Sequence, residues 1–229
     1  MKIAARGASA LSTGIGLLSD VHATPEPVAE ALALFKSRDV DRILCPCDIA
    51  GYGADLDHTV ALLLEHDYQV VLGNHDIWHL EKHAADEETL ASRWFGSLPR
   101  VLQLTIEGKR LYMVHASPPD SVKNGIRLLD IDGNLIVAEK ARWTGYLLGH
   151  LLGFRHDVLL VGHTHQVFCE QLGNTLMINP GSTRFNHTCA ILSLSEMSME
   201  WFGLSGKQPV MSWNWADEKI SWDKAQRRA

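Results

Sequence analysis

Metal-capable side chains follow five short apolar stretches of this sequence. The segments after these stretches read Ser-Asp-Val-His at 19–22, Pro-Cys-Asp at 46–48, Gly-Asn-His-Asp at 73–76, His-Ala-Ser at 115–117 and Gly-His-Thr-His at 162–165. The chain also holds 12 histidines, more than its 6 Phe and 4 Tyr together. Carboxylate, amide and imidazole ligands in combination suit intermediate ions such as Mn, Fe, Zn, Co or Ni.

The spacing of these residues favours one shared site. Asp20 and His22 are two positions apart, as are His163 and His165, so each pair would project to one side of an extended chain. The five segments together offer at least seven carboxylate, amide and imidazole side chains. Seven ligands are too many for one ion. They suit two ions that share a bridging carboxylate, an arrangement that clamps the attacking and leaving oxygens of a phosphoryl centre.

Alternating strands and helices must position these side chains. Strands are predicted at 15–19, 42–45, 69–72, 101–106, 110–114 and 157–161, and helices at 24–38, 55–65, 87–95 and 138–152. Further strands are predicted at 167–172, 175–178, 189–194 and 199–202. This alternation indicates an α/β fold with βαβ units, and the β-rich second part fits two sheets with helices outside them. Because ligands bind at the carboxyl ends of strands in open α/β sheets, we expect the five segments to converge.

Taken in order, the blocks D-x-H, D, G-N-H-D, H-A-S-P and G-H-T-H strongly resemble the calcineurin-like metallophosphoesterase superfamily. The resemblance runs from about residue 16 to residue 184. Residues 48–53 (Asp-Ile-Ala-Gly-Tyr-Gly) and 179–182 (Asn-Pro-Gly-Ser) are similar to its small bacterial and archaeal phosphodiesterase branch. The resemblance implies a four-layer αββα sandwich of two mixed sheets. It also implies hydrolysis of a phosphoric ester, with a diester favoured.

The same resemblance assigns roles to the candidate residues. It implies two divalent transition-metal ions, Mn first, one held by Asp20, His22, Asp48 and His165, the other by Asp48, Asn74, His115 and His163. A hydroxide bridging the ions would be the nucleophile. His75 would face the substrate, stabilising phosphoryl charge or protonating the leaving oxygen, and Asp76 would orient His75.

Two positions depart from the family pattern. Cys47 stands where the family usually has Gly before the bridging Asp, and Ala116 replaces the usual Gly after the motif His. We interpret Cys47 as a packed thiol, with contact to the metal site as the alternative. Cys45, Cys47, Cys169 and Cys189 are too sparse for a disulfide scaffold, so we expect four free thiols in a reducing compartment.

Other side chains are weaker candidates for substrate binding. Arg184 could meet a substrate phosphate or form a surface ion pair, and His79 could line the mouth of the site or lie on a solvated helix face. Lys123, Arg127 and Arg155 are further cations. The Trp-rich tail fits either packing on a sheet edge or a partner site.

Composition limits the class of protein. The 229 residues, 46% hydrophobic and 21% charged, fit one soluble domain over 1–229, with a core at about 15–204 and undetermined ends at 1–14 and 205–229. The net charge of −6 argues against an extended nucleic-acid track, and no apolar run is long enough for a membrane span. We therefore expect a cytoplasmic protein with a small phosphorylated substrate, and a homo-oligomer stays open.

Several functions remain open at this point. The alternative enzyme is a phosphomonoesterase acting on nucleotides or phosphoproteins, and a nuclease is disfavoured by the acidic charge. The alternative of another class is a catalytically silent scaffold of the same fold. Because no proposed ligand is missing, the sequence favours the enzyme.

Overall fold

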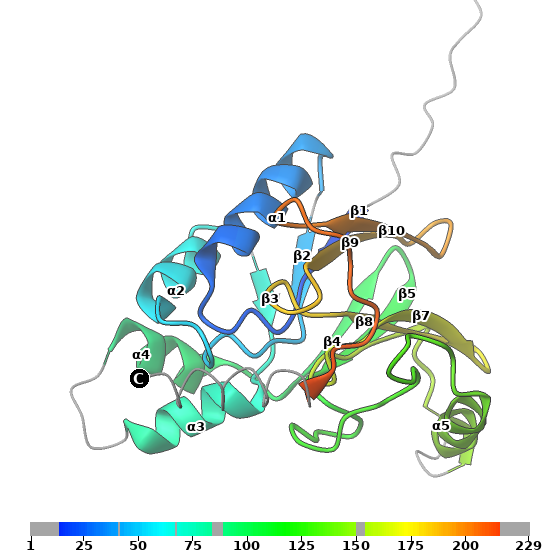
Figure 1. Ribbon diagram of the computed structural model, residues 1–229. Helices are drawn as coiled ribbons and strands as arrows, with labels where there is room; N and C mark the ends of the chain where they lie inside the picture. Colours follow the sequence, from blue (N-terminus) through cyan, green and yellow to red (C-terminus); the bar gives the residue numbers. More distant parts are fainter. Residues whose placement is uncertain (1–13, 41, 67, 84–88, 150–153, 216–229) are drawn as a thin grey trace, which may run out of the picture.

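The computed structural model describes residues 14–40, 42–66, 68–83, 89–149 and 154–215. It contains two five-stranded sheets, with strand orders β10-β9-β1-β2-β3 and β4-β5-β6-β8-β7. In Figure 1 the helices α1 to α4 gather beside the first sheet and α5 lies beside the second. The expected four-layer αββα sandwich is confirmed.

Both sheets have parallel strands at their centre. In the first sheet β1 (Gly14–Leu17), β2 (Arg42–Cys45) and β3 (Tyr68–Val70) are parallel, whereas β9 (Thr188–Ser193) and β10 (Ser198–Gly203) continue it antiparallel. In the second sheet β5 (Lys109–Val114), β6 (Val158–Leu160) and β8 (Thr175–Pro180) are parallel, between the antiparallel edge strands β4 (Val101–Ile106) and β7 (Val167–Leu172). The carboxyl ends of six parallel strands therefore carry the loops that can build a site.

Five helices cover the sheets. They are α1 (Pro25–Ser37), α2 (Leu56–Leu64), α3 (Asn74–Lys82), α4 (Leu90–Ser97) and α5 (Val137–Gly149). The helix predicted from residue 87 begins at Leu90, because the Thr89 hydroxyl caps it by accepting a hydrogen bond from Ser92 N at 3.0 Å. Residues 84–88 and 150–153, which the sequence assigned partly to helices, lie outside the described residues.

Three apolar layers hold the sandwich together. Leu17 and Leu44 of the first sheet pack against residues such as Leu160 of the second, between the sheets. Phe35 and Phe95 fill the layer between the first sheet and its helices. On the far side of the second sheet, residues such as Leu147 of α5 pack against the strands. Each sheet is thus buried on both faces, which explains the continuous apolar strands in the sequence.

Part of the Trp-rich tail lies along the edge of the second sheet. Val167 N donates to Met211 O at 2.8 Å, and Trp213 N donates to His165 O at 3.0 Å. Packing on a sheet edge is therefore what the described part of the tail does. Trp222 and the rest of the tail lie outside the described residues. Among the described helices, none has the length and apolar content needed to cross a membrane.

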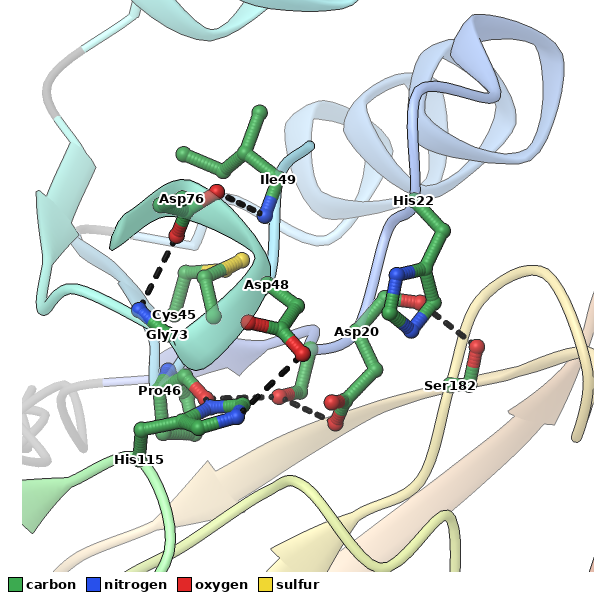
Figure 2. Close-up of a disulfide and its surroundings, with 12 residues drawn as sticks. Asp20, His22, Cys45, Pro46, Asp48, Ile49, Gly73, Asp76, His115 and Ser182 are labelled. Atoms are coloured by element: carbon green, nitrogen blue, oxygen red, sulfur yellow. Dashed lines mark hydrogen bonds and ion pairs between the residues drawn. A yellow bond between two sulfur atoms is a disulfide. The ribbon is translucent and has the colours of Figure 1, made fainter. Parts of the chain in front are cut away.

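The expectation of four free thiols is wrong for two cysteines. Cys45, at the end of β2, and Cys47 form a disulfide with a Cα–Cα distance of 5.0 Å, while Cys169 and Cys189 are free. The extended backbone turns side chains two positions apart to the same side, within the span that a disulfide needs. Both sulfurs lie in the buried layer beneath the helices. Figure 2 shows Cys45 of this disulfide close to Asp48 and Asp76.

Candidate metal centre

The loops after the parallel strands bring all seven candidate ligands together. Asp20 and His22 follow β1, Asp48 follows β2 and Asn74 opens α3 directly after β3. From the second sheet, His115 follows β5, and His163 and His165 follow β6. Figure 2 shows Asp20, Asp48 and His115 turned toward one another. The predicted convergence at the carboxyl edge of both sheets is therefore present in the geometry.

One group of ligands is centred on the loops after β1 and β6. His22 Nε2 lies 3.0 Å from His165 Nε2, and His165 Nε2 lies 3.5 Å from Asp20 Oδ1. The donor atoms of Asp20, His22 and His165 all lie within 4.8 Å of one another, and all three residues are buried. This group could hold one ion.

A second group adjoins the first. His115 Nε2 lies 3.3 Å from Asp48 Oδ2 and 3.2 Å from Asn74 Oδ1. The donor atoms of Asp48, His115 and His163 again lie within 4.8 Å of one another. Asp48 also falls within that distance of His22 in the first group and of His75. Its carboxylate is therefore placed between the two groups.

Four of these ligands have a backbone conformation that differs from the expected one. Asp20, His22, His163 and His165 have φ values of 48°, 51°, 68° and 49°, the left-handed region, rather than the extended chain assumed from their spacing. Asp and His enter this region more readily than most residues, but it remains unfavourable outside glycine. The surrounding contacts must hold it, as is common at functional sites.

Hydrogen bonds from neighbouring loops hold the ligands in place. His163 N donates to both oxygens of Asp20, at 3.0 and 3.1 Å. The Ser19 hydroxyl lies 2.8 Å from Asp20 Oδ2 and 2.9 Å from the Pro46 carbonyl oxygen. His115 Nδ1 lies 2.9 Å from the same carbonyl, and Ser182 Oγ donates to Asp20 O at 2.5 Å. The Nδ1 contact leaves His115 Nε2 directed at the site.

Electrostatics keep both buried carboxylates ionised. Burial opposes the charge on Asp20 and Asp48, but the adjoining imidazoles of His165 and His115 outweigh it, so the pKa of each carboxyl falls below its usual range. Burial also opposes charge on His115, yet Asp48 raises its pKa to about 9. Burial lowers the pKa of His22 to about 3 and that of His163 to about 4. His22 and His163 are therefore neutral, the form that binds metal.

The donor set fits divalent metal ions. Among the described residues, the ion-pair partners of Asp20 and Asp48 are histidines rather than lysine or arginine. Buried carboxylates are normally paired with such cations or coordinate a metal. Two imidazole nitrogens facing each other at 3.0 Å, beside a carboxylate, are likewise suited to a shared cation.

Comparison with known proteins places the chain in a family. Residues 14–197 match the family model of the calcineurin-like phosphoesterase superfamily domain. This chain belongs to that superfamily. Its members use divalent metals, and the histidine and aspartate groups of this chain are able to bind them.

Individual relatives of this chain are distant. An uncharacterized protein of Methanocaldococcus jannaschii is 31% identical over 120 residues, which are 45% of this chain and 49% of that protein, so the match spans about half of the relative. A structure described as a novel archaeal phosphodiesterase has a TM-score of 0.55 at 16% identity, covering 84% of this chain and 100% of that one. A hypothetical protein of Pyrococcus horikoshii has a TM-score of 0.64 at 13% identity, covering 93% and 94%. These two likenesses establish the fold alone.

His75 and Asp76 occupy the first turn of α3, beside the ligand groups. His75 N donates to Asp48 Oδ1 at 2.9 Å, and burial lowers the pKa of its imidazole. Asp76 accepts hydrogen bonds from the backbone amides of Ile49 and Ala50, both at 2.8 Å, and of Gly73 at 2.9 Å. The expected contact of Asp76 with the His75 ring is not among them. Asp76 instead ties the loop after β2 to the start of α3.

A cavity of about 200 Å³ opens over the ligand groups of this chain. Its walls include five of the seven candidate ligands, without Asp20 and His115, and also His75, Tyr52, Trp78, Arg127 and Trp215. Arg127 was one of the weaker cationic candidates, and the three aromatic residues were not predicted. Trp78 follows His75 by one helical turn, a signal that the sequence offered. Trp215 is 50 positions beyond His165, and nothing in the spacing connects them.

Arg184 and His79, the first two substrate candidates, do not line this cavity. Arg184 donates from Nη1 to Thr24 Oγ1 at 2.7 Å and lies over the ring of Phe185. His79 packs against His83 and Phe95, with ring centroids 4.5 and 5.6 Å away. His79 therefore faces α4 rather than the cavity.

Proposed function

We propose that this protein hydrolyses small phosphodiesters with two divalent transition-metal ions, Mn²⁺ foremost. The observation that carries the proposal is the position of Asp48. Its carboxylate lies within ligand distance of both the His115–His163 pair and His22, so it could bridge two ions. Membership of the phosphoesterase superfamily supports this reading, and a phosphodiesterase is among the proteins that share the fold.

Each group of residues has a distinct part in the proposed reaction. Two ions bound here would neutralise charge on the phosphoryl oxygens and acidify the attacking water. His75 is half-buried on the cavity wall, where its neutral ring can donate a hydrogen bond to a phosphoryl oxygen or to the leaving oxygen. Its place in the first turn of α3 adds the positive end of a helix dipole beside an anionic substrate.

The charge of the cavity favours a diester over a monoester. A monoester dianion carries more charge than a diester monoanion, and sites for it supply additional cations beyond the metals. Among the described residues that line the cavity, Arg127 is the single lysine or arginine. The net charge of −6 further supports a small substrate rather than a nucleic-acid polymer.

Location is part of the same proposal. We propose a cytoplasmic protein, as the sequence suggests. The Cys45–Cys47 disulfide is compatible with this, because both residues are fully buried and shielded from cellular thiols.

Metal analysis and a matched substrate pair test the proposal. After loading with Mn²⁺ and removal of excess ion, we expect close to two ions per chain. We expect a higher kcat/KM for bis(4-nitrophenyl) phosphate than for 4-nitrophenyl phosphate, which share a leaving group. A monoester advantage of tenfold or more would overturn the diester preference alone. Two bound ions without hydrolysis of either ester would favour the catalytically silent scaffold. One bound ion or none would contradict the proposal of a two-metal site.

A further inference from the structure

Aromatic side chains form the rim of the metal cavity. Tyr52 comes from the loop after β2, Trp78 from α3 and Trp215 from the segment beside β7, and all three line the cavity. Tyr52 and Trp78 leave 47% and 44% of their surface exposed. Contiguous exposed apolar surface bordered by polar residues marks ligand-binding grooves and interaction sites.

The three rings form an arc around His75. The ring centroid of His75 lies 4.7 Å from that of Trp78 and 4.9 Å from that of Tyr52. Tyr52 lies 5.8 Å from Trp215, which in turn lies 4.7 Å from His165. A group attached to a phosphate at the ligand groups would therefore leave the cavity across aromatic faces.

Arg127 lines the same cavity, and Lys123 lies beside one of the aromatic rings. The Ile126 carbonyl accepts a hydrogen bond from the Thr164 hydroxyl at 3.0 Å. Because Arg127 follows Ile126 and His163 precedes Thr164, this hydrogen bond places Arg127 near His163 on the cavity wall. Lys123 Nζ lies 5.9 Å from the centre of the Trp78 ring, at the outer end of the arc. The rim thus pairs flat apolar faces with positive charge.

We propose that the rim binds the base of a nucleoside, so that the preferred substrates are small nucleoside phosphodiesters. The inference rests on the proposed phosphoesterase function and narrows its substrate class. A cavity of about 200 Å³ is smaller than the ~300–1,000 Å³ usual for whole small-molecule ligands, so it takes the phosphoryl centre and leaves the base outside. A base outside the cavity stacks on Trp78, Tyr52 or Trp215, and Arg127 contacts an oxygen of the sugar or phosphate.

Two substrates with one leaving group test the role of the rim. Thymidine 5′-(4-nitrophenyl) phosphate and methyl 4-nitrophenyl phosphate differ only in the group that stays on phosphorus. We expect the Mn²⁺-loaded protein to prefer the thymidine ester by about tenfold or more in kcat/KM. Trp78→Leu and Tyr52→Leu, both at exposed positions, should each reduce this ratio by about tenfold. Trp143→Leu, on the opposite helix layer, is the control and should leave the ratio unchanged.

Binding without turnover separates this inference from the proposed reaction. Quenching of tryptophan fluorescence by thymidine 5′-monophosphate should be saturable, and Trp78→Leu should weaken the affinity about tenfold. Hydrolysis of both esters at equal efficiency, with no effect of the rim substitutions, would overturn the proposed nucleoside binding by the rim. The proposed phosphoesterase activity would then stand. Nucleotide binding that needs Trp78, in a protein that hydrolyses neither ester, would support nucleoside binding by the rim and contradict the proposed hydrolysis.

Discussion

Asp48 and His75 are neighbours in space with different chemical partners. Asp48 lies within ligand distance of both metal-binding groups and accepts a hydrogen bond from the backbone of His75. The His75 ring lines the open cavity between Tyr52 and Trp78. At the scale of single residues, the proposed function therefore separates metal retention from substrate activation.

Substitution of these two residues should separate the two roles. Asp48→Asn removes the charge that would bridge the ions, so we expect bound metal and activity to be lost together. His75→Ala should keep close to the full metal content and lower kcat by about 10²–10⁴-fold, the usual contribution of a general acid or base. Metal analysis of both variants beside steady-state kinetics checks this. Loss of metal from His75→Ala would show that His75 is a ligand, as its distance from Asp48 and His22 permits.

The residue types predicted which side chains gather at the site, but they did not predict the backbone conformations of those residues. Asp and His after five strand ends pointed to one site, because parallel strands end at the same edge of a sheet. The left-handed backbone of Asp20, His22, His163 and His165 has no sequence signal, since glycine is absent from these positions. Likewise, Asp76 was expected to orient His75. It bonds backbone amides instead, because the turn before α3 buries it against the loop after β2.

At the scale of elements, the strands and helices followed from apolar periodicity, while close approaches between loops did not. Gly73 sits where β3 passes into α3, against the loop after β2. A Cβ added there would lie 1.8 Å from Asp48 Oδ1 and 2.3 Å from the Cys47 carbonyl oxygen. Only a residue without a side chain leaves room for the Asp48 carboxylate.

Gly73→Ala should therefore displace Asp48 and weaken metal binding by tenfold or more. Gly96 in α4 is the matched control, because a Cβ there would meet no atom within 4 Å. Gly96→Ala should keep metal affinity and stabilise the protein by up to about 1 kcal/mol, the difference in helix propensity. Titration with Mn²⁺ and urea unfolding of both variants measure these effects. Unchanged metal affinity in Gly73→Ala would contradict the tight approach.

A carboxylate also connects the starts of β5 and β6. Asp157 Oδ2 accepts a hydrogen bond from Arg110 N at 2.7 Å, and the Arg110 guanidinium lies 3.6 Å away. The backbone hydrogen bond and the guanidinium outweigh desolvation and lower the pKa of Asp157. A lowered pKa in the folded state means that the charge stabilises the protein above the unfolded pKa of about 4, and that this stability is lost as pH falls through the folded pKa.

Asp157→Asn should accordingly cost stability in a pH-dependent way. At pH 7 we expect the variant to be less stable than the wild type by up to about 1 kcal/mol, since the pair is partly exposed. The difference should shrink between pH 4 and pH 2, where wild-type Asp157 takes up its proton. Urea unfolding at pH 7, 5 and 3 checks the trend. A difference that is constant over this range would mean that the charge of Asp157 has no part in it.

At the scale of the whole molecule, the site joins the two sheets. His115 of the second sheet contacts the Pro46 carbonyl of the first, and Asp20 of the first accepts hydrogen bonds from His163 of the second. The convergence of strand ends was predictable from topology. The path of the tail, which brings Trp215 to the cavity from beyond both sheets, depends on edge pairing that no local pattern encodes.

Because both ligand groups draw residues from both sheets, bound metal should stabilise the sandwich as a unit. An ion that binds only the folded protein adds about 2.7 kcal/mol at a concentration of 100 Kd, which in a domain of this size raises Tm by roughly 5–10 °C per site. We therefore expect Tm to rise with Mn²⁺ concentration and to fall on chelation, in one cooperative transition. Asp48→Asn should show little of this rise, whereas Gly96→Ala should show all of it. If chelation leaves Tm unchanged in a protein that is shown to bind two ions, the ions do not connect the two sheets, and the proposed bridging position of Asp48 is wrong.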